Sequence, residues 1–439
     1  MSVLKMIQPE DLRVTSLGEC QFPSPLRFDS PSHPSASHFL TDSHRIRLNV
    51  RVPEDCDNNA PATFEEAGPR ERIFFNPNET TAAIVTCGGL SPGLNNVIRS
   101  VFYGLSESYG VRRVLGIRNG YLGLNPESGL EPITLSKEFV EPIDKLGGTC
   151  LGSSRGPQDP RVMADFLQSN EIDILFCLGG DGTQRGAYDL SQELRSRDSR
   201  ISIVGIPKTI DNDVPFVRLS FGFTTALEKA SEVVRSAHVE AKGAPNGIGL
   251  VKLMGRHAGF IAAGTSVVSQ EVDFTLVPEI PFPLTGDNGL LDALERRMKQ
   301  RGHAVIVVAE GAGQHLIHDS QQKRDRSGNL LHDDIGLFLR HEISQHFSDK
   351  GIPIALKYLD PSYHIRSVPA DVYDRFLCDQ MGRHAVHAAM AGKTGLIVGS
   401  EHGYYIHVPI PAVVSQTKRV DVTDDLWRAV LESTDQPRW

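Results

Sequence analysis

From about Thr80 onward, short apolar runs alternate with stretches whose apolar residues recur at helical spacing. The runs are apolar at successive positions, and polar or glycine-rich residues follow each of them directly. A strand that is apolar on both faces needs a cover on both, so this alternation predicts parallel sheets with helices on each side, an α/β fold. The runs are Ala82 to Thr86, Ile172 to Leu178, Ile201 to Ile206, Ile248 to Leu253 and Ala304 to Ala309.

The N-terminal part of the chain has a different pattern. From about Gln21 to Asn78 it is rich in Pro, Ser, Asp and Asn, with one strand-like stretch at Arg45 to Val52. This composition predicts an extension with little core of its own. The 439 residues exceed the roughly 250 to 300 that one core accommodates, so we expect two domains in the rest of the chain.

Composition excludes several classes of function. The formal net charge of −9 disfavours nucleic-acid backbones and anionic membranes as partners, because both require clustered Lys and Arg. The cysteines are scattered without CxxC pairs, which predicts reduced thiols. No apolar run approaches the roughly 20 residues of a membrane helix, and the first residues lack the apolar core of a signal peptide, so a cytoplasmic location is expected. The pairs His384/His387 and His315/His318 lack a third ligand at suitable spacing, so zinc is not expected.

The loop GGDGT, Gly179 to Thr183, carries the first chemical signal. Glycines let backbone amides approach phosphate oxygens, and the following helix N-terminus adds partial positive charge. A carboxylate beside phosphates is repulsive unless a divalent cation lies between them, so Asp181 indicates a site for magnesium with a nucleotide or pyrophosphate. The alternative is a glycine-rich turn without a ligand.

Two further loops follow apolar runs or lie near them. CGGLSPGLNN has glycines at Gly88, Gly89 and Gly93, but it lacks the GxGxxG spacing, which disfavours a dinucleotide site. LGSSRG places Arg155 in a loop of small residues, where a guanidinium can neutralise charge on a phosphoryl group in transit. A solvated turn explains Arg155 equally well.

The segment PKTIDND, Pro207 to Asp213, sets two carboxylates directly after a buried strand. A hydroxyl that attacks phosphorus must lose its proton, and a carboxylate within hydrogen-bond reach can accept it. Asp211 is the candidate base, with Asp213 beside it to orient it or the metal. An Asx-rich turn is the alternative.

Three more candidate groups lie further along the chain. MGRHAGF places Arg256 and backbone amides between a strand and a helix, where a phosphate or an acceptor hydroxyl can bind. Glu310 follows the run AVIVVA, and Tyr363 and Arg366 lie in DPSYHIRSVP, where Arg366 can hold a second phosphate. Surface ion pairs are the alternative for each of them.

The order of these motifs resembles that of the phosphofructokinase family. GGLSPGLNNVIR, LGSSRG, GGDGT, PKTIDND, SFGFTTAL, VKLMGRHAGF, AEGAG and PSYHIR occur in the family's order, and the resemblance covers roughly Glu66 to Pro437. The N-terminal extension and FEEAGPRERIFFNP are similar to the branch that holds the ATP-dependent enzymes of plants and trypanosomatids. The resemblance implies two Rossmann-like lobes with the active site in the cleft between them, and a homodimer or homotetramer.

The resemblance also implies roles for particular residues and segments. Asp211 would be the proton acceptor, Arg155 and Arg256 would stabilise transferred charge, and Asp181 would hold Mg²⁺. The donor site would comprise Gly89, Arg155, Gly156, Gly180, Asp181, Gly182 and Thr183. The fructose 6-phosphate site would comprise Thr209, Ile210, Asp211, Met254, Gly255, Arg256, Glu310, Tyr363 and Arg366, with Lys357 a further candidate for the sugar phosphate. The expected segments are an extension at 1–79, a donor lobe at 80–220 and about 366–415, a sugar-phosphate lobe at 221–365, and a tail at 416–439.

Two positions bear on the phosphoryl donor. Gly182 leaves room for a nucleotide, whereas pyrophosphate-using relatives carry an aspartate there whose bulk and charge oppose it. Lys208 is the residue of the pyrophosphate users, but the plant and trypanosomatid branch combines this glycine with this lysine. ATP is therefore the expected donor. Gly247 stands where bacterial allosteric enzymes have an arginine, so the resemblance does not extend to their phosphate contact across subunits.

The expected reaction is transfer from Mg-ATP to the C1 hydroxyl of fructose 6-phosphate, a step of glycolysis. A pyrophosphate-dependent enzyme is the first alternative. A nicotinamide-dinucleotide or lipid kinase also carries GGDGT, but PKTIDND and MGRHAGF count against it. A non-catalytic regulatory subunit would have other residues at the acid, base or arginine positions, and this sequence retains all of them. Regulatory sites vary within this family, so allosteric effectors are not predicted.

Overall fold

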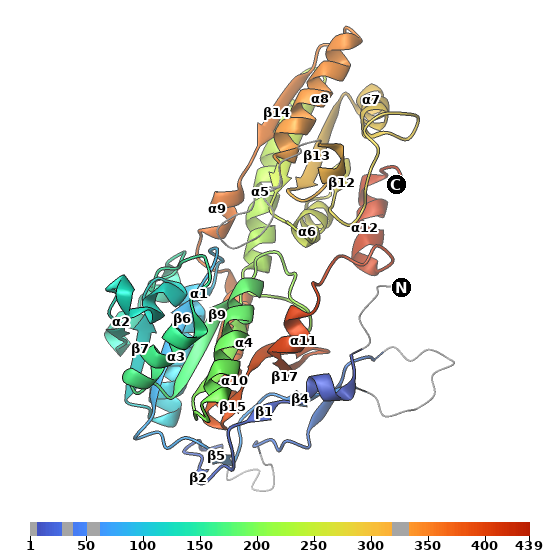
Figure 1. Ribbon diagram of the computed structural model, residues 1–439. Coiled ribbons are helices and arrows are strands. Elements are labelled where there is room, and N and C mark those ends of the chain that lie inside the picture. Colours follow the sequence, from blue (N-terminus) through green and yellow to red (C-terminus); the bar gives the residue numbers. More distant parts are fainter. Residues whose placement is uncertain (1–6, 29–37, 51–61, 318–332) are drawn as a thin grey trace.

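The computed structural model describes residues 7–28, 38–50, 62–317 and 333–439, in which the chain forms two lobes (Figure 1). His318 and the last two residues of the strand-like stretch at Arg45 to Val52 lie outside this part. Each lobe is built on its own sheet, and each sheet contains parallel strands with helices packed against it. The expected α/β fold is therefore confirmed. No helix in the described residues combines the length and the apolar character needed to cross a bilayer.

The larger lobe contains a nine-stranded sheet with the order β3-β4-β17-β16-β10-β9-β6-β7-β8. Its central strands are fully buried and parallel, as the continuous apolar runs predicted. Antiparallel strands flank them on both sides. The bounds are β3 Arg45–Arg47, β4 Thr63–Glu66, β6 Thr81–Thr86, β7 Arg113–Ile117, β8 Ile133–Thr134, β9 Ile174–Gly179, β10 Ser202–Pro207, β16 Leu396–Glu401 and β17 Tyr404–Pro409.

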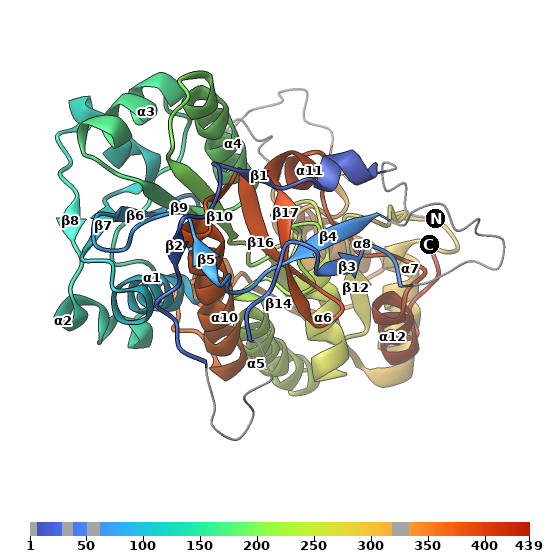
Figure 2. The same ribbon diagram turned by 90° about the horizontal axis from the view of Figure 1, so that it is seen from below.

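Helices cover both faces of this sheet. In Figure 2, which looks along the lobe from below, α1 and α10 lie on one side of the strands, and α3, α4 and α11 lie on the other. Each strand therefore presents side chains to a helical layer on either face, which explains why its sequence is apolar at successive positions. The bounds are α1 Leu94–Tyr103, α2 Lys137–Val140, α3 Pro160–Ser169, α4 Asp181–Ser196, α10 Val372–Met390 and α11 Ile410–Val414.

The smaller lobe contains a four-stranded parallel sheet with the order β12-β13-β11-β14. In β13, Val305 and Val307 pack with α5, α6 and α12, while Ile306 and Val308 pack with α7 and α8. This alternation shows that both faces are covered. The bounds are α5 Phe223–Lys242, β11 Gly247–Leu253, α6 Phe260–Ser269, β12 Phe274–Leu276, α7 Leu290–Arg301, β13 His303–Ala309, α8 Ile335–Asp349, β14 Ala355–Leu359, α9 Ser362–Arg366 and α12 Asp425–Thr434.

The N-terminal extension lies along the larger lobe. Strand β4 pairs with β17 and so joins the nine-stranded sheet, and β1 (Thr15–Ser16) pairs with β15 (Lys393–Thr394). Strands β2 (Phe22–Pro23) and β5 (Arg72–Ile73) pair with each other. The extension's fully buried side chains, Leu12, Phe64 and Ile73, belong to the core of the larger lobe. The extension therefore enlarges that core instead of forming one of its own.

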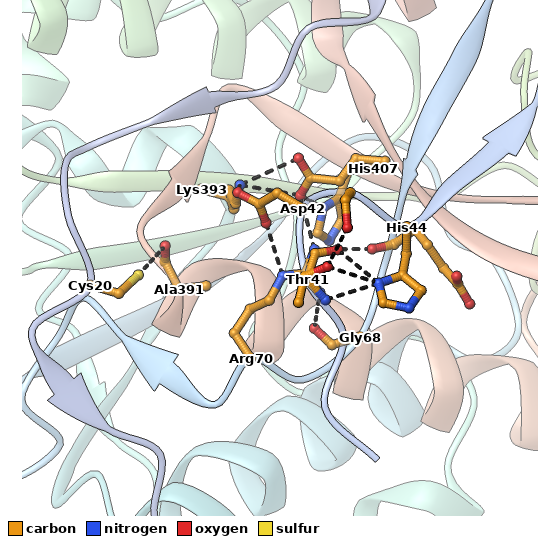
Figure 3. Close-up of polar contacts among 12 residues, drawn as sticks. Cys20, Thr41, Asp42, His44, Gly68, Arg70, Ala391, Lys393 and His407 are labelled. Atoms are coloured by element: carbon orange, nitrogen blue, oxygen red, sulfur yellow. Dashed lines mark hydrogen bonds and ion pairs between the residues drawn. The ribbon is translucent and has the colours of Figure 1, made fainter. Parts of the chain in front are cut away.

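A buried ionic cluster fixes the extension to the lobe (Figure 3). The Glu65 carboxylate accepts hydrogen bonds from Arg70 at 3.1 Å, from His407 Nδ1 at 2.9 Å and from Lys393 Nζ at 3.3 Å. Asp42 also accepts from Arg70 at 3.0 Å and from Lys393 at 2.6 Å. Burial opposes the charge on Glu65, but the hydrogen bond from His407 and the charge of Lys393 lower its pKa below the usual value. Side-chain exposures of 8% for Arg70, 6% for Glu65 and 7% for Lys393 show that water screens these three charges little, whereas the Asp42 side chain is 59% exposed.

Replacing Glu65 by glutamine is expected to lower the free energy of unfolding by about 3 to 5 kcal/mol, because it leaves two buried cations with one fewer anion. Urea unfolding, followed by circular dichroism, measures this change in the free energy of unfolding. Glu71→Gln is the matched control: Glu71 is exposed, so its change is expected to stay within about 0.5 kcal/mol. Equal urea midpoints for the two variants would show that the cluster does not stabilise the fold.

Candidate active site

The carboxyl ends of β6, β9 and β10 bring three of the predicted loops to one edge of the larger sheet. Strand β9 lies between the other two and is parallel to both. The backbone pairing continues past the strand ends, since Cys87 N donates to Leu178 O at 2.9 Å and Lys208 N donates to Gly179 O at 3.0 Å. The loops that follow these strands therefore begin side by side, where ligands bind in open α/β sheets.

The loop after β6 contacts the loop that contains Arg155. Gly88 N donates to Ser154 O at 3.0 Å, and Ser153 Oγ donates to Gly88 O at 2.7 Å. A Cβ on Gly89 would lie 3.5 Å from a terminal nitrogen of Arg155, an ordinary contact distance that places the guanidinium beside this glycine. The structure thus brings together Gly89, Arg155 and the adjoining Gly156, three of the residues predicted for the donor site.

GGDGT forms the turn from β9 into α4. A Cβ on Gly179 would lie 2.1 Å from Thr183 Oγ1, so the tight turn requires glycine there. Asp181 is the first residue of α4 and is exposed, and its carboxylate accepts a hydrogen bond of 3.0 Å from Arg185. An exposed carboxylate beside glycine amides at a helix N-terminus fits a hard cation that carries a phosphorylated ligand.

Lys208 lies beneath these loops, and it is 6% exposed. Its Nζ donates to Gly89 O at 2.5 Å and so links the loop after β10 to the loop after β6. Burial and, to a smaller extent, the charge of Arg155 lower the pKa of Lys208 to about 8, although Asp211 and Asp213 oppose the shift. The lysine therefore places a cation next to both the donor glycines and the candidate base.

Asp211 follows β10 at the same edge as Asp181. Its backbone N–H donates to Thr209 Oγ1 at 3.1 Å, and that hydroxyl donates to Asp213 Oδ1 at 2.7 Å. Asp213 thus orients the loop through Thr209, while Oδ1 of Asp211 is buried and has no hydrogen-bond partner among the described residues. Burial, together with the charges of Asp213 and Glu310, raises the pKa of Asp211 well above its usual value. A raised pKa makes this carboxylate a stronger proton acceptor.

The smaller lobe contributes the loops after β11 and β13. Glu310 N donates to Leu253 O at 2.9 Å, and Gly311 N donates to Gly255 O at 3.1 Å, so the two loops are bonded together. Gly255 has a φ of +128°, and a Cβ there would lie 2.7 Å from Ala258 O, which explains the glycine between Met254 and Arg256.

Charges connect these loops to Asp211 in the other lobe. The charge of Arg256 acts on the carboxyl groups of both Asp211 and Glu310, and it favours their ionised forms. Burial raises the pKa of Glu310, while Arg256, Lys252 and Arg366 oppose that shift. The candidate base, Arg256 and Glu310 thus lie within electrostatic reach of one another, across the boundary between the lobes.

Helix α9 carries Tyr363 and Arg366, two further residues predicted for the sugar-phosphate site. The Arg366 guanidinium lies over the Tyr363 ring at 4.6 Å, and the Tyr363 side chain is 75% exposed. Lys357 is different: it lies in the middle of the edge strand β14, where it pairs with Gly249. Four residues separate Gly249 from the end of β11, a distance of about 13 Å along a strand. The structure therefore does not bring Lys357 to the strand ends with the others.

The motif analysis did not single out Lys252. This residue lies in β11, two residues before Met254, and its Nζ forms ion pairs with Asp334 at 2.7 Å and Asp360 at 2.9 Å. Asp360 precedes α9, so Lys252 fixes the segment that carries Tyr363 and Arg366. Its position inside the motif VKLMGRHAGF is the signal in the sequence that could have indicated its place near the site.

Comparisons with known proteins agree with this geometry. The sequence model of a family described as Phosphofructokinase matches residues 81–389. A relative from Borreliella burgdorferi, named ATP-dependent 6-phosphofructokinase, is 46% identical over 434 residues, which are 97% of this chain and 97% of that protein. A relative of the same name from Trypanosoma brucei brucei is 42% identical, with 99% of this chain and 89% of that protein covered.

A solved structure shows a similar fold. It is titled a pyrophosphate-dependent phosphofructokinase from Marinobacter aquaeolei, and it superposes with a TM-score of 0.65. The match covers 81% of this chain and 91% of that one at 22% sequence identity. At this identity the likeness concerns the fold alone.

Proposed function

The chain belongs to the phosphofructokinase family, and on that premise we propose that it transfers the γ-phosphoryl group of ATP to the C1 hydroxyl of fructose 6-phosphate. The products are fructose 1,6-bisphosphate and ADP, in a step of glycolysis. The arrangement that carries this proposal is the carboxylate of Asp211 between two sets of loops. Donor glycines lie on the side of its own lobe, and Arg256 and Glu310 lie on the side of the other.

In the proposed mechanism, Asp211 accepts the proton of the attacking hydroxyl. Its buried, unpartnered Oδ1 is available for that hydrogen bond. Arg155 on the donor side and Arg256 on the acceptor side stabilise negative charge on the phosphoryl group, and Glu310, Tyr363 and Arg366 orient the sugar phosphate. Positioning and electrostatics therefore supply most of the rate enhancement.

Mg²⁺ is the proposed metal, and Asp181 is its proposed ligand. When bound, the ion would neutralise phosphate charge next to the carboxylate. The exposure of Asp181 at the N-terminus of α4 supports this, because an oxygen ligand must be open to the ligand side to share the ion with phosphate oxygens.

A pyrophosphate donor is the second candidate, and Lys208 is the residue that favours it. Its buried ammonium group touches the donor glycine loop and can meet a phosphate with no nucleotide attached. The open space around Gly182 favours ATP, because a Cβ at this position would meet no atom within 4 Å.

The chain is further proposed to form a homodimer or homotetramer. Apolar side chains exposed on the first turns of α10 support this: Val372 is 72% exposed, Tyr373 51% and Phe376 62%. Exposed apolar side chains that cluster on a surface are typical of interfaces between subunits.

Turnover of the purified protein with fructose 6-phosphate tests the proposed function. ATP and pyrophosphate are compared at equal magnesium, and fructose 1,6-bisphosphate is measured. We expect product with ATP and at least about tenfold less with pyrophosphate. Faster turnover with pyrophosphate would reassign the donor. Binding of fructose 6-phosphate without turnover by either donor would indicate a regulatory subunit.

A further inference from the structure

The C-terminal segment between α11 and α12 crosses from the larger lobe to the smaller one. Helix α11 packs on α4 and β17, whereas α12 packs on α6 and β12 (Figure 1). On its way, the segment contacts the Asp211 loop of the larger lobe through Lys418. On the smaller lobe, Val420 contacts Glu279, which in turn binds the loop MGRHAGF.

Lys418 holds the loop that carries the proposed base. Its backbone N–H donates to Asp213 O at 2.9 Å, two residues after Asp211. Its Nζ donates to Val217 O at 2.8 Å and to Arg218 O at 2.9 Å, further along the same loop. One residue thus binds three carbonyls of a segment that is irregular apart from an isolated bridge between Val217 and Ser400 of β16.

The loop needs such an anchor because its backbone is strained. Asn212 has a φ of +56° and Phe216 a φ of +60°, although neither is glycine. A bulky residue such as Phe216 rarely adopts this conformation, which persists only where the surroundings enforce it. Strain that lies between Asp211 and the anchored carbonyls indicates that external contacts, rather than local preference, fix the place of the base.

The ammonium group of Lys418 also reaches the smaller lobe. Its Nζ lies 5.0 Å from the ring centroid of Phe260, the first residue of α6. Burial lowers the pKa of Lys418 to about 8, while the charges of Glu401 and Asp213 oppose the shift. A lysine in such surroundings needs the two carbonyls as acceptors, so the contact is a specific one.

Glu279 ties the same segment to the loop MGRHAGF. Its carboxylate accepts hydrogen bonds from Gly259 N at 3.0 and 3.1 Å and from Val420 N at 2.8 Å. Gly259 lies three residues after Arg256, and Val420 is 4% exposed in the core of the smaller lobe. Residues Lys418 to Val420 therefore bind the Asp211 loop directly, and they reach the Arg256 loop through the Glu279 carboxylate and the Phe260 ring.

We propose that Lys418 is a positioning residue for phosphoryl transfer, which fixes the Asp211 loop of the larger lobe against the Arg256 loop of the smaller lobe. The inference rests on the proposed function and deepens it. Displacing a reacting group by about 1 Å can cost about a hundredfold in rate, so a base on a strained loop depends on its anchor. Within the described residues, no recorded hydrogen bond or ring contact joins the Lys418 side chain to the donor loops.

Three variants test this inference, and each is measured by steady-state kinetics and by amide hydrogen exchange. Lys418→Met removes the ammonium group but keeps an unbranched side chain of nearly the same length, and we expect kcat to fall about 10- to 100-fold, with KM for ATP changed less than about twofold. Lys418→Arg keeps donors for both carbonyls and is expected to regain most of kcat. Lys299→Met is the matched control on α7, because the Lys299 side chain is 70% exposed.

Exchange separates positioning from general destabilisation. In Lys418→Met, amides between Asn212 and Ser220 are expected to exchange faster, while those of α7 stay as in the wild type. An unchanged kcat in Lys418→Met, or faster exchange throughout the molecule, would overturn the positioning role. A wild-type protein that is inactive with fructose 6-phosphate would overturn the proposed function instead, and faster exchange confined to the loop would still support the anchor.

Discussion

Replacing Asp211 by serine is expected to lower kcat by about a hundredfold or more, with KM for fructose 6-phosphate within about threefold of the wild-type value. The hydroxyl of serine is too weak a base to accept the proton of the attacking sugar. The smaller side chain also leaves Thr209, Asp213 and the backbone hydrogen bond of residue 211 in place, because that bond is made by the main chain. Initial rates at saturating ATP and varied fructose 6-phosphate measure both constants.

Asp189→Ser is the matched control for this experiment. Asp189 is exposed on α4 and remote from the strand ends, so its loss is expected to leave kcat unchanged. Turnover of Asp211→Ser close to that of the control would exclude Asp211 as the base. A large rise in KM with an unchanged kcat would instead show that Asp211 contributes binding alone.

The same carboxyl group determines the expected dependence on pH. Since burial and the neighbouring charges raise the pKa of Asp211, the group takes up a proton at a higher pH than an ordinary aspartate does. Activity is therefore lost as the pH falls through this raised value, and kcat/KM for fructose 6-phosphate should decline on the acid side above the usual aspartate range. Asp213→Asn removes one of the charges that raise the pKa, so its acid limb should move to lower pH.

Much of the fold could be predicted because it follows from local pattern. The run Ala304 to Ala309 is apolar at each position, and the structure shows why: successive residues of β13 pack against opposite helical layers. The glycines of GGDGT were equally informative. A Cβ on Gly179 would collide with the side chain of Thr183, only four residues later, so both residues of this contact lie within the same short motif.

The contacts that were missed join residues that are distant in sequence. Glu65 in the extension is held by Lys393, which follows more than three hundred residues later, and neither residue belongs to a periodic pattern. Lys418 lies in a tail whose composition is that of an ordinary loop, and it contacts the base loop some two hundred residues before it. No local spacing indicates such pairs, because the fold alone brings them together.

Lys357 shows the converse. The family resemblance made it a candidate for the sugar phosphate beside Tyr363 and Arg366, but it lies within strand β14, level with Gly249 and about 13 Å from the end of β11. Motifs in loops at strand ends thus converge at one edge of each sheet, whereas Lys357 lies within a strand, and its role stays a prediction.

Replacing Gly182 by aspartate is expected to lower kcat/KM for ATP by about a hundredfold. The fold should accept the change: a Cβ at this position would meet no atom within 4 Å, and an acidic residue in the first turn of a helix is favourable. The added carboxylate would stand beside Asp181, where phosphate oxygens are proposed to bind. Its charge then opposes the donor unless a further cation compensates it.

Gly182→Ala separates charge from bulk, because it adds the Cβ without the carboxylate and is expected to retain kcat/KM for ATP within about threefold. Both variants are assayed with ATP and with pyrophosphate at fixed fructose 6-phosphate and magnesium. Equal losses in the two variants would assign the effect to bulk, and full ATP activity in Gly182→Asp would show that this position does not select the donor. If pyrophosphate use rises in Gly182→Asp alone, then Gly182 and the buried Lys208 together set the choice of donor, since Lys208 already places its ammonium group against the Gly89 carbonyl.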